Sequence, residues 1–467
     1  MFKRLACCVA LLLAVAPALA SETRLALDTT LPHAPDVFAD ALPVQLDARH
    51  DGEWILQGET LHWSHRIVAD HATALALELE TLRLPPGANL QIGDESWQGP
   101  LVARARFTRH QPGAVLEVSA DVPRAAADGF ELRIVAVQAA FRDPFAAPAP
   151  VVAKAGEACA VNAACVAGNS VQPWGGAVVA LIVLNTATCT GTLMNNSAGD
   201  ARPYLLTARH CYTGAGGSDP VRAAASLRMA WNAVAACGAP LSSAWGAGAT
   251  FTAGATHRAE FGDSWLVELG SRPPDSVSPW YAGFDAGDQL PTGPLTGLHH
   301  GGALQRQVLS TTVPASVARV TSYLLPGVDL LGWAFSPLLG SASAGASGSG
   351  LFDAQGRVIG TLSTGVACDA GLPQVTYARL AQAWSGNGTA AGSLKPWLDP
   401  VNSGSQLSGK GFSGTNLPLL AATPATSAPL AAANTDAGGS SGGALGAGAG
   451  GLLLGAALWR RRQRAIV

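Results

Sequence analysis

Hydrophobic and polar residues alternate along several short stretches in the first third of the chain. In residues 75–84 leucine recurs at nearly every second position, and residues 132–137 repeat the pattern. A period of two is typical of strands that bury one face. Turns are expected at Pro85-Pro86-Gly87 and at Pro112-Gly113. We therefore predict that residues 21–155 form a β-rich domain that resembles a β-sandwich.

The next block, residues 156–411, holds short apolar segments at 177–184, 264–269 and 357–362, separated by glycine, proline, serine and asparagine. Few stretches sustain the period of a helix, and only residues 381–397 indicate one. This pattern predicts an all-β domain closed into barrels or sandwiches.

The N-terminal end has the pattern of a secretory signal. Lys3 and Arg4 precede an apolar run over residues 5–15, and Ala18-Leu19-Ala20 supplies a small-residue cleavage site. The run is short and is soon followed by Pro17, which disfavours the alternative of a membrane anchor. The sequence thus predicts that residues 1–20 are removed and that the chain is exported.

The C-terminal end combines a spacer with an apolar segment. Residues 412–442 are rich in Ala, Thr, Ser, Pro and Gly and predict a flexible linker. Residues 443–459 carry no charge and are followed by an arginine cluster within 460–464. We expect residues 443–467 to form a membrane-spanning helix with its arginines on the cytoplasmic side. The alternative is a Gly/Ala-rich disordered tail with a basic end.

Composition and charge narrow the class of protein. Hydrophobic residues make up 48% and charged residues 13% of the chain, which excludes disordered and coiled-coil chains. The net charge of -3 offers no electrostatic footprint for a phosphate backbone, so we expect no nucleic-acid partner.

Cysteine usage fits an exported protein. Of the 8 cysteines, Cys7 and Cys8 lie in the signal. The remaining even number favours disulfides outside a reducing cytosol, and arithmetic alone leaves about fifteen pairings open. No C-x-x-C pair is present, so we expect no metal. These cysteines are Cys159, Cys165, Cys189, Cys211, Cys237 and Cys368.

The most informative string is LLTARHC at 205–211, with CTGTL upstream at 189–193. A disulfide from Cys211 to Cys189 would fix the loop that carries His210. An imidazole held in place at near-neutral pKa is suited to act as a general base. A histidine taken alone is more often structural, but this string resembles the histidine signature of chymotrypsin-like serine peptidases.

The expected nucleophile is Ser347, within GASGSG at 345–350 and followed by an apolar strand. Glycines let a tight turn expose the hydroxyl, and the N–H groups of Gly345 and Ser347 would form an oxyanion hole. Taken alone, the string could equally be a flexible Ser/Gly loop. Its position after His210, with a strand behind it, favours the catalytic interpretation.

The third member of such a site is a carboxylate that orients the histidine. Asp263 opens a predicted strand and is the preferred candidate, while Asp275, Asp285 and Asp288 lie in loops where turn roles are commoner. Attack by a serine in such a triad requires no cofactor.

Beyond the triad, residues 159–409 resemble the lysyl endopeptidase branch of the chymotrypsin-like peptidases, secreted by bacteria with a long propeptide. The resemblance implies a double β-barrel, and it implies that residues 21–155 are propeptide-like. It also implies the disulfides Cys159–Cys368, Cys165–Cys237 and Cys189–Cys211. It rests on CTGTLMNN (189–196), LTARHC (206–211), WYAGFD (280–285), LHHG (298–301), GASGSG (345–350) and WLDP (397–400).

The sequence departs from that branch in the specificity pocket, expected at Val375, Ser363 and Gly365. Where lysine-specific members carry an aspartate, this chain has Val375. An apolar floor would leave a substrate ammonium unpaired, so we do not expect strict lysine specificity unless Asp369 reaches the pocket. Ser363 stands where a histidine associated with high activity is expected.

The C-terminal end resembles the Gly-Gly sorting signal of bacteria with type II secretion, because GGSSGG at 438–443 precedes the apolar segment and the arginines. The resemblance implies transient anchoring in the inner membrane and cleavage by a rhomboid-type protease. Release to the cell surface or the medium would follow.

These observations predict a secreted or surface-tethered serine endopeptidase, made as a precursor, that acts on proteins or peptides. One alternative is a surface binding protein on a peptidase scaffold. Another keeps the N-terminal β domain as a permanent targeting module. The adjacent His299 and His300 would point to opposite faces of a strand, so we expect them to have packing roles.

Overall fold

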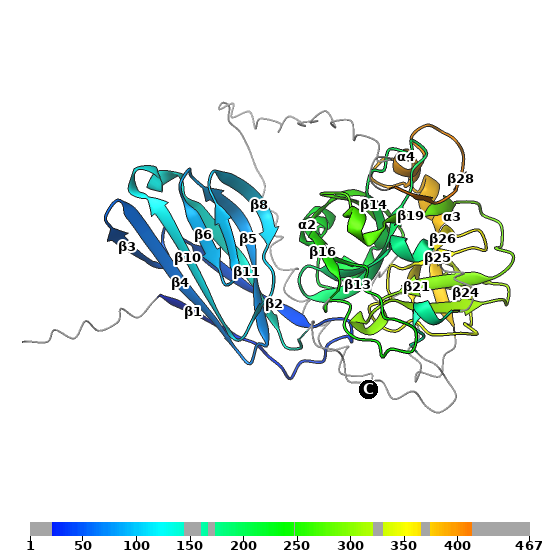
Figure 1. The fold of residues 1–467 in the computed structure, drawn as a ribbon, viewed down its shortest axis with the longest axis horizontal. Coiled ribbons are helices and arrows are strands. Elements are labelled where there is room, and N and C mark those ends of the chain that lie inside the picture. The colour runs from blue at the N-terminus through cyan, green and yellow to red at the C-terminus, as the bar shows by residue number, and fades with distance from the viewer. Residues whose placement is uncertain are drawn as a thin grey trace, which may run out of the picture. The chain divides into compact units, whose positions relative to one another are not determined.

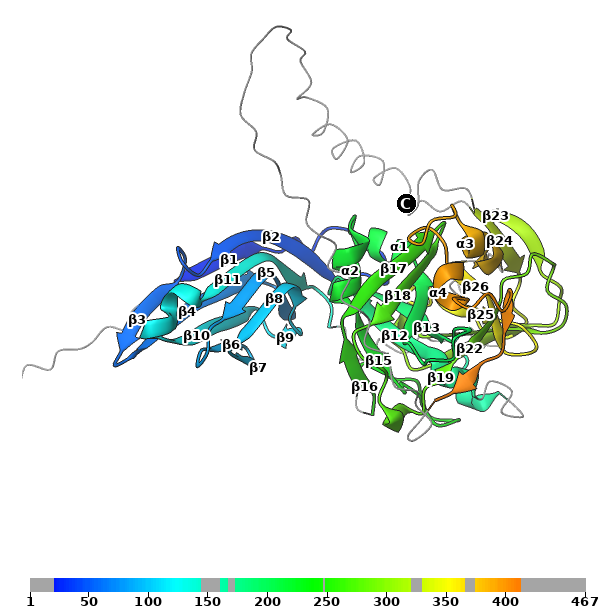
Figure 2. The same ribbon diagram turned by 90° about the horizontal axis from the view of Figure 1, so that it is seen from above.

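The computed structural model describes residues 21–143, 160–166, 173–246, 248–320, 330–365 and 374–412. The predicted signal, linker and C-terminal helix, as well as Cys159, Cys368 and Asp369, lie outside these ranges. Strands dominate the described residues, as expected for an all-β protein (Figures 1 and 2). Within these ranges, no helix has the length and apolar character of a membrane span.

The N-terminal domain consists of two sheets. One has the order β1 (Glu22–Ala26), β4 (Thr60–Asp70), β10 (Val115–Pro123), β6 (Asn89–Ile92) and β7 (Glu95–Gln98), with β3 (Glu53–Gln57) paired to β4. The other has the order β2 (Ala39–Asp47), β11 (Glu131–Ala140), β5 (Ala74–Leu84) and β8 (Leu101–Phe107), with β9 (Gln111–Pro112) paired to β5. A short 3-10 helix, η1 (Arg124–Gly129), joins β10 to β11. Apolar side chains from both sheets, including Trp63, Ile67, Leu77 and Leu132, form one core, so the domain is β-sandwich-like.

The leucine pattern of β5 reflects this core. Leu75, Leu77 and Leu79 are fully buried, and the phase then shifts by one position to Leu82. A bulge in the β5–β11 pairing accounts for the shift, because Leu79 pairs with Ile134 while Thr81 pairs with the preceding Arg133. The opposite face of β5 is also buried, because Glu78 binds Arg222 of the second domain.

The second domain is built from two large sheets, which the sequence resemblance predicts to form a double β-barrel. The first sheet has the order β16 (Thr250–Ala253), β15 (Arg228–Trp231), β12 (Val178–Val183), β13 (Ala187–Met194), β14 (Tyr204–Ala208), β18 (Ser264–Leu269) and β17 (Ala255–Phe261). Every residue of β12, β13 and β14 is buried, which explains why the apolar segment at 177–184 lacks alternation.

The second sheet runs β22 (Gln307–Thr311), β21 (Leu295–His299), β25 (Gly350–Phe352), β26 (Arg357–Thr364), β27 (Val375–Arg379), β24 (Leu330–Phe335) and β23 (Ser316–Val320). Strand β20 (Gly283–Asp285) pairs with β26 and with β28 (Gln406–Leu407), and β19 (Trp280–Tyr281) pairs with β29 (Lys410–Gly411). The C-terminal segment of the described chain thus returns to the barrel.

The helices are short. They are α1 (His210–Thr213), α2 (Pro220–Ser226), α3 (Leu380–Ser385) and α4 (Lys395–Leu398), with 3-10 turns η2 (Ala163–Cys165), η4 (Trp174–Ala177), η5 (Asp275–Val277) and η6 (Gly301–Ala303). The helix expected over 381–397 is therefore two separate helices. Gly386 follows α3 with φ of 47°, and a Cβ there would lie 1.7 Å from the Gly392 carbonyl oxygen. This close backbone approach ends the helix.

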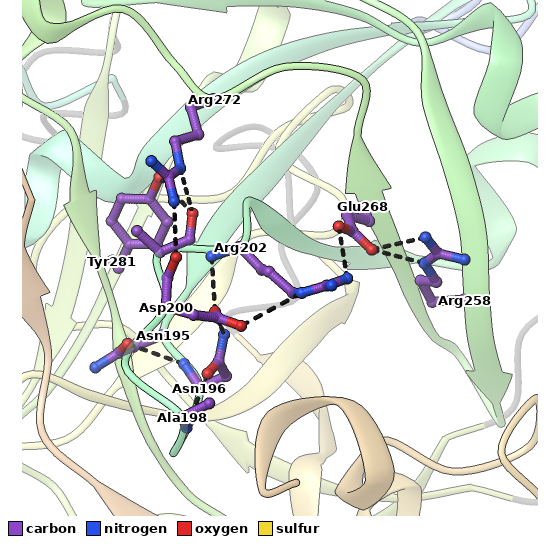
Figure 3. A network of polar contacts seen from close by, with 10 residues as sticks. Asn195, Asn196, Ala198, Asp200, Arg202, Arg258, Glu268, Arg272 and Tyr281 are labelled. Atoms are coloured by element: carbon purple, nitrogen blue, oxygen red, sulfur yellow. Dashed lines mark hydrogen bonds and ion pairs between the residues drawn. The ribbon is translucent and has the colours of Figure 1, made fainter. Parts of the chain in front are cut away.

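A polar network fixes one end of the β14–β18 pair (Figure 3). Glu268 accepts from Arg202 at 3.3 Å and from Arg258 at 2.7 Å. The Asp200 side chain accepts from the Arg202 backbone at 3.0 Å, and Arg272 donates to the Asp200 carbonyl oxygen at 2.8 Å. These partly buried charges hold the turn before β14 in place. The candidate chemistry lies at the other end of the same strand pair.

Candidate active site

The β14–β18 register brings His210 and Asp263 together. Ala208 pairs with Ser264, so the residue just before β18 meets the residues just after β14. His210 Nδ1 lies 2.8 Å from Asp263 Oδ2, and the His210 backbone N–H donates to Oδ1 at 2.9 Å. The Arg209 backbone N–H donates to the Asp263 carbonyl oxygen at 2.8 Å. The carboxylate thus fixes both the ring and the backbone of His210.

The surroundings of this pair favour a charged imidazole. Burial lowers the pKa of His210, but the Asp263 charge, the hydrogen bond to it and the Asp36 charge outweigh burial and raise that pKa above 6.5. Ser363 also donates its hydroxyl to Asp263 Oδ2. Ser363, which the sequence also predicts at the specificity pocket, thus has its hydroxyl against the carboxylate.

The competing carboxylates have other partners. Asp285 pairs with Arg357 at 3.0 Å, and Asp288 contacts Arg379. Asp275 begins the 3-10 turn η5. Asp263 is therefore the carboxylate that the structure places against His210.

Two of the predicted disulfides are present, Cys165–Cys237 and Cys189–Cys211. The second joins β13 to the first turn of α1, with a Cα–Cα distance of 6.2 Å. It anchors the backbone directly after His210. The predicted Cys159–Cys368 bond lies outside the described residues.

The loop that carries Ser347 packs against the same region. The Thr190 backbone N–H donates to the Ser347 carbonyl oxygen at 2.8 Å, and Cys211 Sγ lies 3.7 Å from that oxygen. Ser347 is therefore a neighbour of the residue that follows His210. Among the described residues, the hydrogen bonds of the His210 ring go to Asp263, and none joins it to the Ser347 hydroxyl.

Glycine is required beside Ser347. Gly348 has φ of 85°, and a Cβ there would lie 2.2 Å from Thr207 Oγ1 and 2.5 Å from the Thr190 carbonyl oxygen. Gly345 also has a positive φ, 89°. Only glycine adopts such a backbone at little cost in so small a space. The turn can therefore approach β13 and β14 closely.

The other predicted pocket residues lie near this loop. Val375 is fully buried in an apolar cluster that also contains Ala342 and Ala346. A Cβ at Gly365 would lie 2.2 Å from the Ala342 carbonyl oxygen. Val375 and Gly365 thus pack against the segment that precedes Ser347.

His299 and His300 are buried and hydrogen-bonded to the backbone. His299 Nδ1 accepts from the Gly301 N–H at 3.0 Å, and His300 Nδ1 donates to the Leu304 carbonyl oxygen at 2.9 Å. Burial lowers the pKa of His299 to about 4 and that of His300 to about 3. Both are neutral packing residues. The part of the chain that the structure describes holds no cluster of metal-ligating side chains.

Two groups of polar residues at this site were not predicted from the sequence. One is the row Thr188, Thr190 and Thr192 on β13, whose hydroxyls face the Ser347 loop or the N-terminal domain. The other is Asp36, whose charge acts on His210. The alternating threonines in an otherwise apolar strand could have indicated the first group. The sequence around Asp36 carries no comparable signal.

The chain is similar to known proteases. Residues 153–376 match the family model for the lysyl endopeptidase C-terminal domain. Similar solved structures include the active form of the Rv3671c protease from M. tuberculosis, at 17% identity and a TM-score of 0.31, covering 50% of this chain and 89% of that one. The HtrA-type protease AlgW with a tripeptide has 18% identity and a TM-score of 0.29, with 45% and 58% covered. The MamO protease domain from Magnetospirillum magneticum has 14% identity and a TM-score of 0.29, with 44% and 94% covered. The family match supports a serine protease that is distantly related to the lysyl endopeptidases.

Proposed function

We propose that the chain is a serine endopeptidase that cleaves proteins or peptides through an acyl-enzyme intermediate. The observation that carries the proposal is the buried His210–Asp263 pair, 2.8 Å apart, next to the loop of Ser347. Because Asp263 accepts the Nδ1 proton, Nε2 is left as the basic nitrogen of the neutral ring.

In the first step, Ser347 Oγ attacks the substrate carbonyl carbon while His210 Nε2 takes the hydroxyl proton. The N–H groups of Gly345 and Ser347 bind the resulting oxyanion. The intermediate collapses to an ester on Ser347 as His210 protonates the leaving amine. Water, deprotonated by His210, then hydrolyses the ester and restores the serine.

The substrate preference follows from the apolar pocket floor. Val375 offers no charge to a substrate ammonium, so we propose apolar or small residues rather than strict lysine on the acyl side of the cleaved bond. Profiling the cleavage of a peptide library tests this. Predominant cleavage after lysine would contradict it and would favour a pocket role for Asp369.

We further propose that this activity is exerted outside the cell. We propose export, with type II secretion, transient anchoring through residues 443–467 and release by a rhomboid-type protease. Residues 21–155 are proposed to be removed or displaced on activation. Mass spectrometry of the extracellular protein tests both points, because its N-terminus lies near residue 155 if the domain is a propeptide and near 21 if it is a permanent module.

The activity itself is tested by hydrolysis of a fluorogenic peptide mixture. Wild type should turn the peptides over, whereas His210→Ala and Ser347→Ala should lose about 10⁴-fold or more. A wild type as inactive as these variants would favour the alternative, a surface binding protein on a peptidase scaffold.

A further inference from the structure

Thr190, in the middle of β13, contacts both residues of the proposed oxyanion hole. Its hydroxyl donates to the Gly345 carbonyl oxygen at 2.8 Å, and its backbone N–H donates to the Ser347 carbonyl oxygen at 2.8 Å. The residue is fully buried. Thr190 thus holds the Gly345–Ser347 turn at both ends, with its hydroxyl at Gly345 and its backbone N–H at Ser347.

The hydroxyl also accepts from the His300 backbone N–H at 3.0 Å. Two residues further on, the Gly302 N–H donates to the Ala344 carbonyl oxygen at 2.6 Å. In a trans peptide the N–H points opposite to the C=O, so this bond sets the direction of the Gly345 N–H. The Thr190 hydroxyl therefore ties together the two segments that orient the Gly345 peptide groups.

We propose that Thr190 is a positioning residue whose hydroxyl aims the Gly345 N–H at the oxyanion. The inference rests on the proposed function. Oxyanion stabilisation acts mainly in the transition state, so loss of the hydroxyl lowers kcat and leaves KM nearly unchanged.

Thr190→Val keeps the shape but removes the hydroxyl, leaving the Gly345 C=O and the His300 N–H unpaired. For the exported protein, after its N-terminal domain has left, we expect kcat to fall about 10- to 100-fold, and a peptide boronic acid to bind more weakly by a similar factor. Thr190→Ser restores the hydroxyl and should recover most of the activity.

Thr192→Val is the matched control. Thr192 lies on the same strand, is equally buried and accepts from the Gly350 N–H at 3.0 Å, but it does not bind Gly345. The Thr192→Val variant measures how far kcat falls when a buried threonine hydroxyl is lost from this strand without any effect on Gly345. The inference is overturned if Thr190→Val keeps kcat within about twofold of wild type, or if both valine variants lose kcat equally. A wild type without activity would contradict the proposed function instead.

A second, independent observation concerns the N-terminal domain. Residues 36–38 pair with the start of β13: the Phe38 N–H donates to the Thr186 carbonyl oxygen at 2.8 Å, and the Thr188 N–H donates to the Asp36 carbonyl oxygen at 2.9 Å. Val37 and Ala187 are directly opposed in an antiparallel bridge. Thr188 precedes Cys189 of the disulfide that anchors His210, and its hydroxyl would lie 3.2 Å from a Cβ at Gly345.

Residues 36–38 are held in place by further contacts with the second domain. Phe38 is buried in an apolar cluster with Ile182 and Trp245 of the protease domain. Nearby, the Asn185 side chain donates to the Thr108 carbonyl oxygen at 2.9 Å. The Asp36 carboxylate raises the pKa of His210, so its charge acts on the catalytic pair.

We infer that residues 36–38 are an internal inhibitory strand that occupies the active-site edge of β13 in the precursor. The inference rests on the proposed function. While the strand is seated, a substrate backbone cannot pair with residues 186–188, and turnover is suppressed until the N-terminal domain leaves.

A disulfide between Val37→Cys and Ala187→Cys tests this in the full chain. Facing residues whose neighbours carry the hydrogen bonds are about 4.5 Å apart at Cα, which suits a disulfide. The bond keeps the strand seated even after the linker is cut. Once the linker between the two domains is cut in both proteins, we expect peptide turnover of the disulfide variant to be at least about tenfold below that of Val37→Ser/Ala187→Ser, with recovery on mild reduction.

A second comparison does not depend on new cysteines. Asp36→Arg should unseat the strand and speed labelling of the full chain by a fluorophosphonate, whereas Asp128→Arg on the exposed η1 turn should not. The inference is overturned if, after the linker is cut, the locked protein turns over peptide as fast as its serine counterpart, or if Asp36→Arg labels no faster than wild type. If no variant labels or turns over peptide, the proposed function fails instead.

Discussion

His210 Nδ1 and Asp263 Oδ2 lie 2.8 Å apart at the shared end of β14 and β18, and the same carboxylate accepts the His210 backbone N–H. Asp263 thereby sets the position of the ring and the tautomer of its nitrogens. Replacing it by asparagine keeps the shape but removes the charge.

Asp263→Asn should lower kcat by about 10⁴-fold, because the ring is then free to take the wrong tautomer. Steady-state peptide hydrolysis measures the effect. Asp285→Asn, which loses the ion pair with Arg357 and alters the hydrogen bonds from Gln406 and Gly287 but does not touch His210, is the control and should stay close to wild type. Equal activities for the two variants would contradict the proposed role of Asp263.

The pH dependence of kcat/KM tests the electrostatics of the pair. Burial lowers the pKa of His210, but the Asp263 charge, the hydrogen bond to it and the Asp36 charge together outweigh burial and raise that pKa above 6.5. Only the neutral imidazole accepts a proton, so activity should be lost as the pH falls through this raised pKa. We expect the midpoint of the acid limb above pH 6.5, and a midpoint below that value would count against this assignment.

The Cys189–Cys211 bond should contribute both stability and activity. It closes a segment with a sequence separation of 22, and its removal by a double alanine substitution should cost about 2–4 kcal/mol of unfolding free energy. Chemical denaturation measures this. The Cys165–Cys237 pair is the comparison, because its removal should destabilise the fold while sparing activity in the folded fraction.

Gly348 tests how closely the Ser347 turn must approach the first barrel. In Gly348→Ala the new Cβ meets Thr207 Oγ1 at 2.2 Å, so we expect folded protein with little or no activity. Gly388→Ala is a matched control, since Gly388 has a similar φ of 81° but nothing within 4 Å of the added Cβ. That control should cost only about 1 kcal/mol of stability from backbone strain. Similar activities in the two variants would show that the close approach is unimportant.

The sequence was most informative about features that depend on a single strand. The alternating leucines of β5 predicted a buried face, and the position of Asp263 at the start of a predicted strand favoured it over the carboxylates in loops. Contacts that depend on two distant segments were not predictable. The hydroxyl of Thr190 acquires its role only once β13 lies against the Ser347 turn.

The same limit applies to the N-terminal domain. Its β-sandwich character was predictable from period-two patterns, but the burial of Glu78 on the second face of β5 was not, because it depends on Arg222 in the other domain. Likewise, nothing local to Asp36 indicates that it pairs with β13, about 150 residues later. The helix expected over 381–397 failed for a local reason, the tight turn at Gly386.

The central claim is that the hydroxyl of Ser347 is the nucleophile activated by His210. Its most direct test is to treat the exported protein with a fluorophosphonate and to locate the adduct by peptide mass spectrometry. We predict a single adduct on Ser347, absent from Ser347→Ala and greatly slowed in His210→Ala. An adduct on Ser343 or Ser349, or labelling that is unaffected by His210→Ala, would contradict the account.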